Sequence, residues 1–105
     1  MTNYIQVFVS IDNKDNAKIL AKKILENKLG ACVQLIDGIN SFYWWKSNID
    51  ESNETLLLIK TKSDLYDNLE KFIKENHSYD IPEIIIMPIV GGNKDYFGWI
   101  EENLG

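Results

Sequence analysis

The spacing of hydrophobic residues changes several times along the chain, and each change predicts a new element. From Tyr4 to Ile11 every second residue is a β-branched aliphatic one, and this period of two predicts a strand. Over residues 14–28 apolar residues recur every three or four positions, which predicts a helix. Asp12 and Asn13 precede this helix as cap-type residues, and Gly30 stands where a C-terminal cap glycine is expected. The expected buried stripe of the helix comprises Ala17, Leu20, Ala21, Ile24 and Leu25.

A long β-hairpin is predicted across residues 30–62. Two runs rich in β-branched, aromatic and aliphatic residues flank a polar segment, residues 47–53, which is expected to connect the two arms. Asp37 and Gly38 lie inside the first arm, and apolar residues resume at once with Ile39. This pattern predicts a bulge or bend within the strand rather than a chain reversal.

The second half of the chain again shows a helix pattern followed by a strand pattern. A helix is predicted over residues 63–77, and a loop over 78–83 because Pro82 biases the residue before it toward an extended shape. The last strand is predicted over 84–90, where Pro88 indicates an edge strand or a bulge. A short terminal helix is expected after Asn93. The apolar residues assigned to these helices are Leu65, Leu69, Phe72 and Ile73 in the first, and Tyr96, Phe97, Trp99 and Ile100 in the second.

The order of elements, β-α-β-β-α-β followed by a terminal helix, predicts an α+β fold of the ferredoxin-like type. We expect a sandwich in which an antiparallel sheet carries both main helices on one face. The chain has 105 residues, of which 45% are hydrophobic and 26% charged. These are ordinary values for a globular protein of this size, so one domain is predicted over residues 1–105.

Neither arm of the predicted hairpin has a purely polar face. In the first arm Phe42 and Trp44 point to one side of the strand, while Tyr43 and Trp45 point to the other. A sheet covered by helices on one face requires apolar side chains on that face only. The apolar side chains on the other face must therefore be covered by another part of the protein or by another subunit. The pattern therefore predicts self-association through the far face of the sheet, with Phe42, Trp44 and Trp45 at the interface.

Charge and cysteine content argue against several classes of function. The net charge is −5 and every basic residue is a lysine, which argues against general nucleic-acid binding and leaves no arginine cradle for an acyl-phosphate hydrolase. The sequence has no Lys/Arg-Gly-Phe run of an RNA recognition module. Its one cysteine, Cys32, allows neither an intrachain disulfide nor a Cys-x-x-Cys metal carrier. No nucleophile with a base and an orienting partner is recognisable, so we expect no enzyme.

No membrane or secretory segment is predicted. The longest nearly apolar run, residues 81–90, is interrupted by Pro82, Glu83 and Pro88 and is too short for a membrane span. The first residues lack the basic and apolar regions of a signal peptide. We therefore expect a cytoplasmic protein with no membrane partner.

Several motifs, spread in order over nearly the whole chain, resemble those of one family. They are Ala31-Cys32-Val33, Ile36-Asp37-Gly38-Ile39-x-Ser41-x-Tyr43-Trp44-Trp45, Glu54 followed by Leu58-Ile59-Lys60-Thr61, Glu75-Asn76-His77-x-Tyr79-x-x-Pro82-Glu83-Ile84, Pro88-Ile89, and Gly92-Asn93-x-x-Tyr96-x-x-Trp99. Through them the chain resembles the CutA family of divalent-cation-tolerance proteins. It departs from the family pattern at Ser78, where proline is usual, and at Ser47-Asn48, where the hairpin turn is usually Gly-Lys. The resemblance implies a ferredoxin-like homotrimer, similar in assembly to the PII signalling proteins, with hairpins packed across subunits and clefts between neighbours.

The resemblance also implies a metal site. Cys32 matches a cysteine proposed as a copper ligand in relatives, and a soft thiolate suits Cu(I); equally, a free cysteine at a strand start is often a small buried hydrophobe. His77 is the only histidine, and imidazole suits copper; equally, it can interact with the last carbonyls of a helix. One cysteine per chain cannot close a metal site alone, so a site would combine subunits, or Cys32 with His77.

Two hypotheses therefore remain open. The first is a homotrimeric protein that binds copper or another divalent cation through Cys32, His77 or acidic residues, serves cation tolerance and the response to metal ions, and needs no obligatory cofactor. The second is a PII-like signalling or scaffold protein whose intersubunit cleft, lined by Lys60, Tyr79 and Glu83, binds a small ligand or a protein partner. Metal affinity should depend on Cys32 and His77 under the first hypothesis. Under the second, Lys60 should matter and metal should be dispensable.

Overall fold

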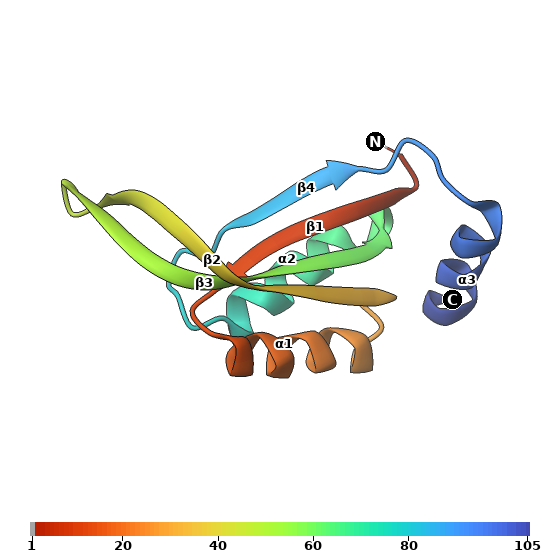
Figure 1. Ribbon diagram of the computed structural model, residues 1–105. Helices are drawn as coiled ribbons and strands as arrows, with labels where there is room; N and C mark the ends of the chain where they lie inside the picture. The colour runs from red at the N-terminus through yellow and green to blue at the C-terminus, as the bar shows by residue number, and fades with distance from the viewer. Residues whose placement is uncertain (1) are drawn as a thin grey trace.

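The computed structural model describes residues 2–105, and its four strands form one antiparallel sheet with the order β2-β3-β1-β4 (Figure 1). In chain order the elements are β1 (Tyr4–Ile11), α1 (Lys14–Glu26), β2 (Cys32–Trp45), β3 (Asn48–Lys62), the 3₁₀ turn η1 (Ser63–Leu65), α2 (Tyr66–Asn76), β4 (Ile84–Pro88) and α3 (Lys94–Leu104). The predicted ferredoxin-like α+β fold with an added terminal helix is thereby confirmed.

The core lies between the sheet and the two helices α1 and α2, which cover one of its faces (Figure 1). The period-two pattern of β1 places its aliphatic residues on that face, where they are at most 1% exposed. The buried residues that meet there are Ile5, Val7, Val9, Ile11, Ala17, Leu20, Ala21, Ile24, Leu57, Ile59, Leu69 and Ile73. Leu25, which was predicted to be buried, is 39% exposed, because it lies about 100° of helix rotation beyond Ile24.

Helix α1 begins as predicted and ends earlier than predicted. Asn13 is its N-cap, with Oδ1 accepting the backbone N–H of Asn16 at 2.8 Å. The helix stops at Glu26, and the left-handed residue after it is Lys28, with φ 57°, rather than Gly30. Gly30 has another role: a Cβ there would lie 3.0 Å from methyl groups of both Ile24 and Ile59. Glycine lets the backbone approach the core closely at this point.

Strands β2 and β3 form a long hairpin whose distal part projects beyond the helix-covered body (Figure 1). The register shifts between Ile36 and Ile39, and Gly38 has φ 72°, so the predicted bulge is confirmed. In Figure 1 the hairpin bends away from the helix layer as it leaves the body. We define its projecting part, residues 39–54, as the distal hairpin.

The connection predicted over residues 47–53 is wrong. The chain reverses at Lys46 and Ser47 alone, and Asn48 is already paired with Trp45. Both turn residues have positive φ, 49° and 67°, as in a two-residue type I′ turn. Polar residues continue along the start of β3 because the distal hairpin has no helix above it, so burial does not select for apolar residues there.

The elements after the hairpin differ from the prediction mainly at their ends. A 3₁₀ turn comes first, and α2 itself starts at Tyr66. Strand β4 ends at Pro88 rather than at residue 90, and it pairs only with β1. Pro88 therefore lies on an edge strand, as predicted. None of the helices among residues 2–105 is long and apolar enough to span a membrane.

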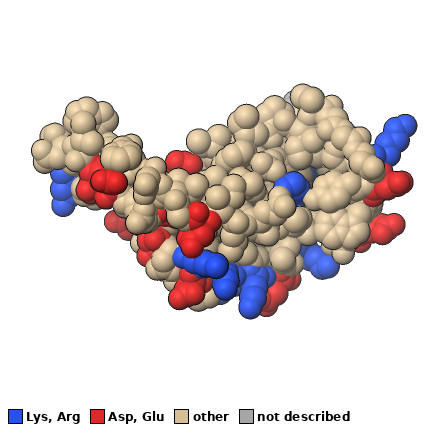
Figure 2. Space-filling view, in the orientation of Figure 1, with Lys and Arg blue, Asp and Glu red and all other residues tan. Residues whose placement is uncertain are grey.

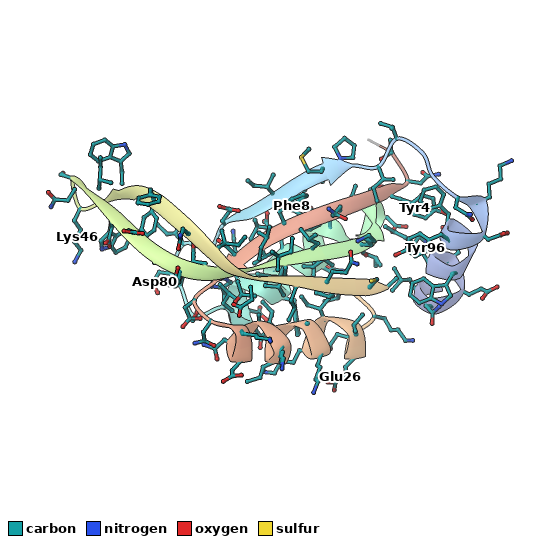
Figure 3. The ribbon with its side chains drawn as sticks, viewed as in Figure 1. Tyr4, Phe8, Glu26, Lys46, Asp80 and Tyr96 are labelled. Atoms are coloured by element: carbon teal, nitrogen blue, oxygen red, sulfur yellow. The ribbon has the colours of Figure 1, made fainter. Side chains whose placement is uncertain are left out.

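Helix α3 docks against the end of the sheet through a few side chains. The ring of Phe97 stacks on Tyr4, with centroids 4.6 Å apart and planes 6° from parallel. Glu101 accepts the Tyr4 hydroxyl at 2.9 Å and pairs with Lys62 Nζ at 3.0 Å. Ile100 is fully buried. Figure 3 places Tyr4 beside α3, at the opposite end of the molecule from Lys46 in the hairpin turn.

The sheet face opposite α1 and α2 and both sides of the distal hairpin leave large apolar side chains exposed. On the far face of the sheet, Ile85 and Met87 are each 49% exposed. On the hairpin, Phe42 is 67%, Trp44 73%, and Trp45 55% exposed. Figure 2 shows the surface over β4 almost free of charged residues, while lysines and carboxylates gather along the α1 side. A single chain thus leaves exposed the apolar side chains for which the sequence predicted a second covering surface.

Candidate functional site

Cys32 is the first residue of β2 and lies opposite Lys60 of β3. Its thiol is free and half-buried, beside Tyr96 of α3. The pKa of Tyr96 is raised, first by burial of its hydroxyl and then by its electrostatic interaction and side-chain hydrogen bond with Cys32. Cys32 is therefore a partly accessible soft donor with a polar neighbour, rather than a fully buried hydrophobe.

His77 lies directly after α2, and both of its ring nitrogens are hydrogen-bonded within the chain. Nε2 lies 2.7 Å from the carbonyl oxygen of Ser10, and Nδ1 accepts the backbone N–H of Tyr79 at 2.9 Å. Since Nδ1 accepts, the ring proton is on Nε2, which donates to Ser10. A metal ion can bind His77 only if one of these two bonds breaks.

The structure does not bring Cys32 and His77 together within one chain. His77 is bonded to Ser10, which lies opposite Leu56, whereas Cys32 lies opposite Lys60. Four residues along β3 separate these positions by roughly 13 Å. Throughout residues 2–105, no group of three or more His, Cys, Asp or Glu side chains is arranged to hold a metal ion.

Tyr79 contacts a carboxylate that the sequence reading did not place in the site. Its hydroxyl donates to Glu54 Oε2 at 3.0 Å, and Glu54 is only 7% exposed. Burial first, and then the hydrogen bond to Glu54, raise the pKa of Tyr79. The pair ties the loop after α2 to the start of the distal hairpin.

The three cleft candidates do not line one cleft within a single chain. Lys60 donates through Nζ to Gln34 Oε1 on the neighbouring strand, about 20 Å along β3 from Glu54, the partner of Tyr79. Glu83 is exposed on the loop before β4. Tyr79 and Glu83 thus share a loop, and Lys60 lies apart from them, nearer to Cys32.

An acidic hollow of about 320 Å³ lies where the hairpin leaves the body. Asp12, Asp37 and Glu54 contribute carboxylates to it, and each is already bonded within the chain. Asp12 accepts from Asn16 and Ser78, and these bonds outweigh the effect of burial and lower its pKa. Asp37 accepts the Thr55 hydroxyl at 2.8 Å, which lowers its pKa.

Sequence reasoning missed this cluster because its members are far apart along the chain. The available signal was the presence of carboxylates at the end of β1, at the bulge of β2 and near the middle of β3. Only the strand register shows that these three positions are adjacent.

Comparisons with known proteins agree on one family. The sequence model described as CutA1 divalent ion tolerance protein matches residues 5–103. The rice (Oryza sativa subsp. japonica) protein named CutA 1, chloroplastic, is 44% identical over 99 residues, which cover 94% of this chain and 56% of that protein. The Thermus thermophilus divalent-cation tolerance protein CutA is 36% identical over 99 residues, covering 94% of this chain and 96% of that protein. The chain thus spans about half the length of the rice relative.

Solved structures give the same result. The crystal structure of CutA1 from Oryza sativa matches with a TM-score of 0.94 at 43% identity, covering 97% of this chain and 94% of that one. The match includes the hairpin and the terminal helix, since nearly the whole chain is covered.

Proposed function

The chain belongs to the CutA1 divalent ion tolerance family, and from this premise we propose that it is a homotrimer that binds copper or another divalent cation and serves cation tolerance. Relatives bear the name divalent-cation tolerance protein. The proposed assembly rests on one observation, the uncovered aromatic side chains of the distal hairpin. A chain that exposes Phe42, Trp44 and Trp45 by more than half has a surface typical of a protein interface.

The described residues of one chain favour a metal site formed between subunits over a site formed within a single chain. Cys32 is the only thiol in the sequence, and one cysteine cannot form a closed metal site by itself. No group of side chains that could complete such a site forms within residues 2–105. Cys32 would therefore bind the ion together with donors from a neighbouring subunit. The metal is cargo in this proposal, and the fold does not depend on it.

Cys32 is the stronger of the two proposed ligands. Its thiol is half-buried and makes its side-chain hydrogen bond with Tyr96, whereas His77 must first lose a bond to the backbone of Ser10 or of Tyr79. We therefore propose that Cys32 is the primary ligand and that His77 contributes only if the loop after α2 opens.

Native mass spectrometry before and after addition of a modest excess of Cu(II) tests this proposal. The expected result is a trimer with a defined number of copper ions, which falls in Cys32→Ser. His77→Gln is the matched variant: its amide can still donate to the Ser10 carbonyl, so copper loss with an intact trimer would assign His77 as a ligand. A monomer would refute the assembly, and unchanged copper uptake in Cys32→Ser would refute the ligand.

A trimer without defined copper uptake would favour the second function, a PII-like sensor or scaffold. The partly buried Tyr79–Glu54 hydrogen bond, which ties the loop after α2 to the hairpin, favours this alternative, because a ligand that breaks the bond would change the hairpin's position. Lys60→Met should then weaken ligand binding, whereas Cys32→Ser should not.

In either case we propose that the protein has a binding role and catalyses no reaction. We also propose that it is located in the cytoplasm. The separation of Cys32 from His77, roughly 13 Å along β3, supports a non-catalytic role, since a nucleophile and its base must be within hydrogen-bond reach. Fractionation of cells that express the chain from its own gene tests the compartment.

A further inference from the structure

Helix α3 is attached to the rest of the chain by side chains alone. Within residues 2–105, the last backbone hydrogen bond to the sheet is the one that the N–H of Ile89 donates to the carbonyl of Tyr4. The backbone bonds at the two ends of α3, from Phe97 and Gly105, stay within the helix and its cap. An element without backbone bonds to its neighbours can open locally while the rest of the fold remains intact.

Two sets of contacts hold α3 at the end of the sheet, and we call them the α3 latch. Phe97 stacks on Tyr4 with centroids 4.6 Å apart, and Glu101 bonds both the Tyr4 hydroxyl and Lys62 Nζ. The Glu101 side chain is 43% exposed, so water competes for its bonds. Ile100 is fully buried but lies outside the core between the sheet and the helices α1 and α2, so its burial depends on the docking of α3.

Two consecutive glycines join β4 to α3. A Cβ at Gly91 would have no atom within 4 Å, whereas a Cβ at Gly92 would lie 2.9 Å from Cζ of Phe97. The docked ring thus occupies the space that a side chain at position 92 would need. Glycine also has more backbone freedom than any other residue, so the pair can act as a hinge for the helix.

The thiol of Cys32 lies beside this helix. Tyr96, in the first turn of α3, makes a side-chain hydrogen bond with Cys32, and its ring stacks on Trp99 at 5.6 Å. Figure 1 shows α3 at the end of the sheet where β2 begins, and Figure 3 places Tyr96 at that end. Lys62 of the latch is only two residues, about 7 Å, along β3 from Lys60, the cross-strand partner of Cys32.

We propose that α3 is a hinged cover over Cys32, which opens at Gly91 and Gly92 and controls how fast a soft metal ion or a thiol reagent reaches the sulfur. Because Tyr96 and Trp99 are both on α3, opening removes the two aromatic side chains from the thiol's end of the sheet together. The inference rests on the proposed function only in taking Cys32 as the metal ligand.

Alkylation of the metal-free protein with iodoacetamide measures the opening. Cys32 is the only cysteine in the chain, so mass spectrometry follows the reaction of a single sulfur atom. The reagent is uncharged, so a change of charge nearby does not alter its local concentration. When opening and closing are fast, the alkylation rate follows the population of the open form.

Gly92→Ala and Gly91→Ala are matched substitutions. Both remove a glycine from the linker, but only the change at position 92 places a methyl group against the ring of Phe97. Loss of an aromatic stack changes an equilibrium by a factor of about 2–10. We therefore expect Gly92→Ala to be alkylated about 2–10 times faster than the wild-type protein, and Gly91→Ala to react at nearly the wild-type rate. Equal rates for the two variants would overturn the inference.

A second pair of variants leaves the hinge unchanged. Glu101→Gln weakens the bonds to Lys62 and to Tyr4, and Glu102→Gln, at an exposed neighbouring position, removes the same charge. The inference requires faster alkylation in Glu101→Gln and the wild-type rate in Glu102→Gln. It fails if Glu101→Gln reacts no faster than Glu102→Gln.

Amide hydrogen exchange distinguishes opening of α3 from unfolding of the whole chain. In Gly92→Ala the amides of α3 should exchange faster, while those of β1, whose side chains form the core, should keep their wild-type rates. Equal acceleration in β1 would attribute the alkylation to global unfolding and would overturn the inference.

Copper uptake separates this inference from the proposed function. Gly92→Ala retains Cys32, so it should bind as many copper ions as the wild-type protein, but faster. Copper uptake that is unchanged in Cys32→Ser, with fast alkylation of Gly92→Ala, would refute the ligand and leave the cover standing. Copper loss in Cys32→Ser, with alkylation of Gly92→Ala at the wild-type rate, would refute the cover and leave the ligand standing.

Discussion

The imidazole of His77 joins three parts of the chain through one side chain. It follows α2, it donates to Ser10 at the end of β1, and it accepts from Tyr79 in the loop before β4. The loop is held further by Ser78, which donates to Asp12, and by Tyr79, which donates to Glu54. At the scale of a residue, His77 is therefore first a structural connector.

Replacing His77 should destabilise the fold even without metal. His77→Ala leaves the Ser10 carbonyl and the Tyr79 N–H without their partner, and we expect a loss of about 1–3 kcal/mol in the free energy of unfolding. His77→Gln retains a donor for Ser10 and His77→Asn retains an acceptor for Tyr79, so each should lose less. Urea unfolding of metal-free protein measures the three values. An Ala variant as stable as the wild type would contradict the structural role.

Glu101 makes the stability of the folded state depend on pH in the acid range. Hydrogen bonds from Lys62 first and Tyr4 second lower the pKa of Glu101. A carboxylate with a lowered pKa stabilises the folded state fully above its unfolded-state pKa, about 4.3 for glutamate. That contribution is lost as the pH falls through the folded-state pKa.

The corresponding experiment compares Glu101→Gln with Glu102→Gln, an exposed neighbour on the same helix. Below about pH 5 the wild-type protein and Glu102→Gln should lose stability more steeply than Glu101→Gln, which has already lost this contribution. Thermal unfolding at several pH values gives the slopes. Parallel curves for all three proteins would mean that Glu101 does not hold α3 to the sheet.

At the scale of an element, the hairpin turn is strained by its own residues. Lys46 and Ser47 both adopt positive φ, 49° and 67°, a region that costs a residue other than glycine about 1–2 kcal/mol. A type I′ turn favours Asn-Gly at these two positions.

The double variant Lys46→Asn/Ser47→Gly should therefore be more stable than the wild-type protein by about 1–2 kcal/mol. Ser47→Ala serves as the control, because alanine has the same backbone restriction as serine at this position and should give no gain. Differential scanning calorimetry of the three proteins measures the difference. An unchanged melting temperature in the double variant would show that the turn is not strained.

The elements that the sequence predicted well are those whose pattern repeats on a buried face. β1 and α1 show their periods because the core selects an apolar residue at every second position of the strand and once or twice in every turn of the helix. The bulge in β2 was predictable from Asp37-Gly38. The distal hairpin has no core beneath it, so its polar residues 48–53 were read as a loop although they form a strand. The Tyr79–Glu54 pair could not be predicted either, since it depends on the register of strands distant in sequence.

At the scale of the whole molecule, the proposed assembly through the exposed hairpin predicts that stability depends on protein concentration. If the proposed assembly forms, unfolding includes dissociation, and the melting temperature should rise with concentration. An isolated chain would show no such rise. This measurement therefore reports on assembly without a ligand or a partner.

Trp44→Ser sharpens this test, because Trp44 is 73% exposed in one chain. In a monomer, a change at such a surface position alters the free energy of unfolding by no more than about 0.5 kcal/mol. At the centre of an interface, loss of a tryptophan costs about 2 kcal/mol or more. We expect Trp44→Ser to lower the melting temperature at high protein concentration and to reduce its rise with concentration. Ile19→Ser, 53% exposed on α1, should leave both unchanged, so equal effects of the two substitutions would exclude the hairpin as the assembly surface.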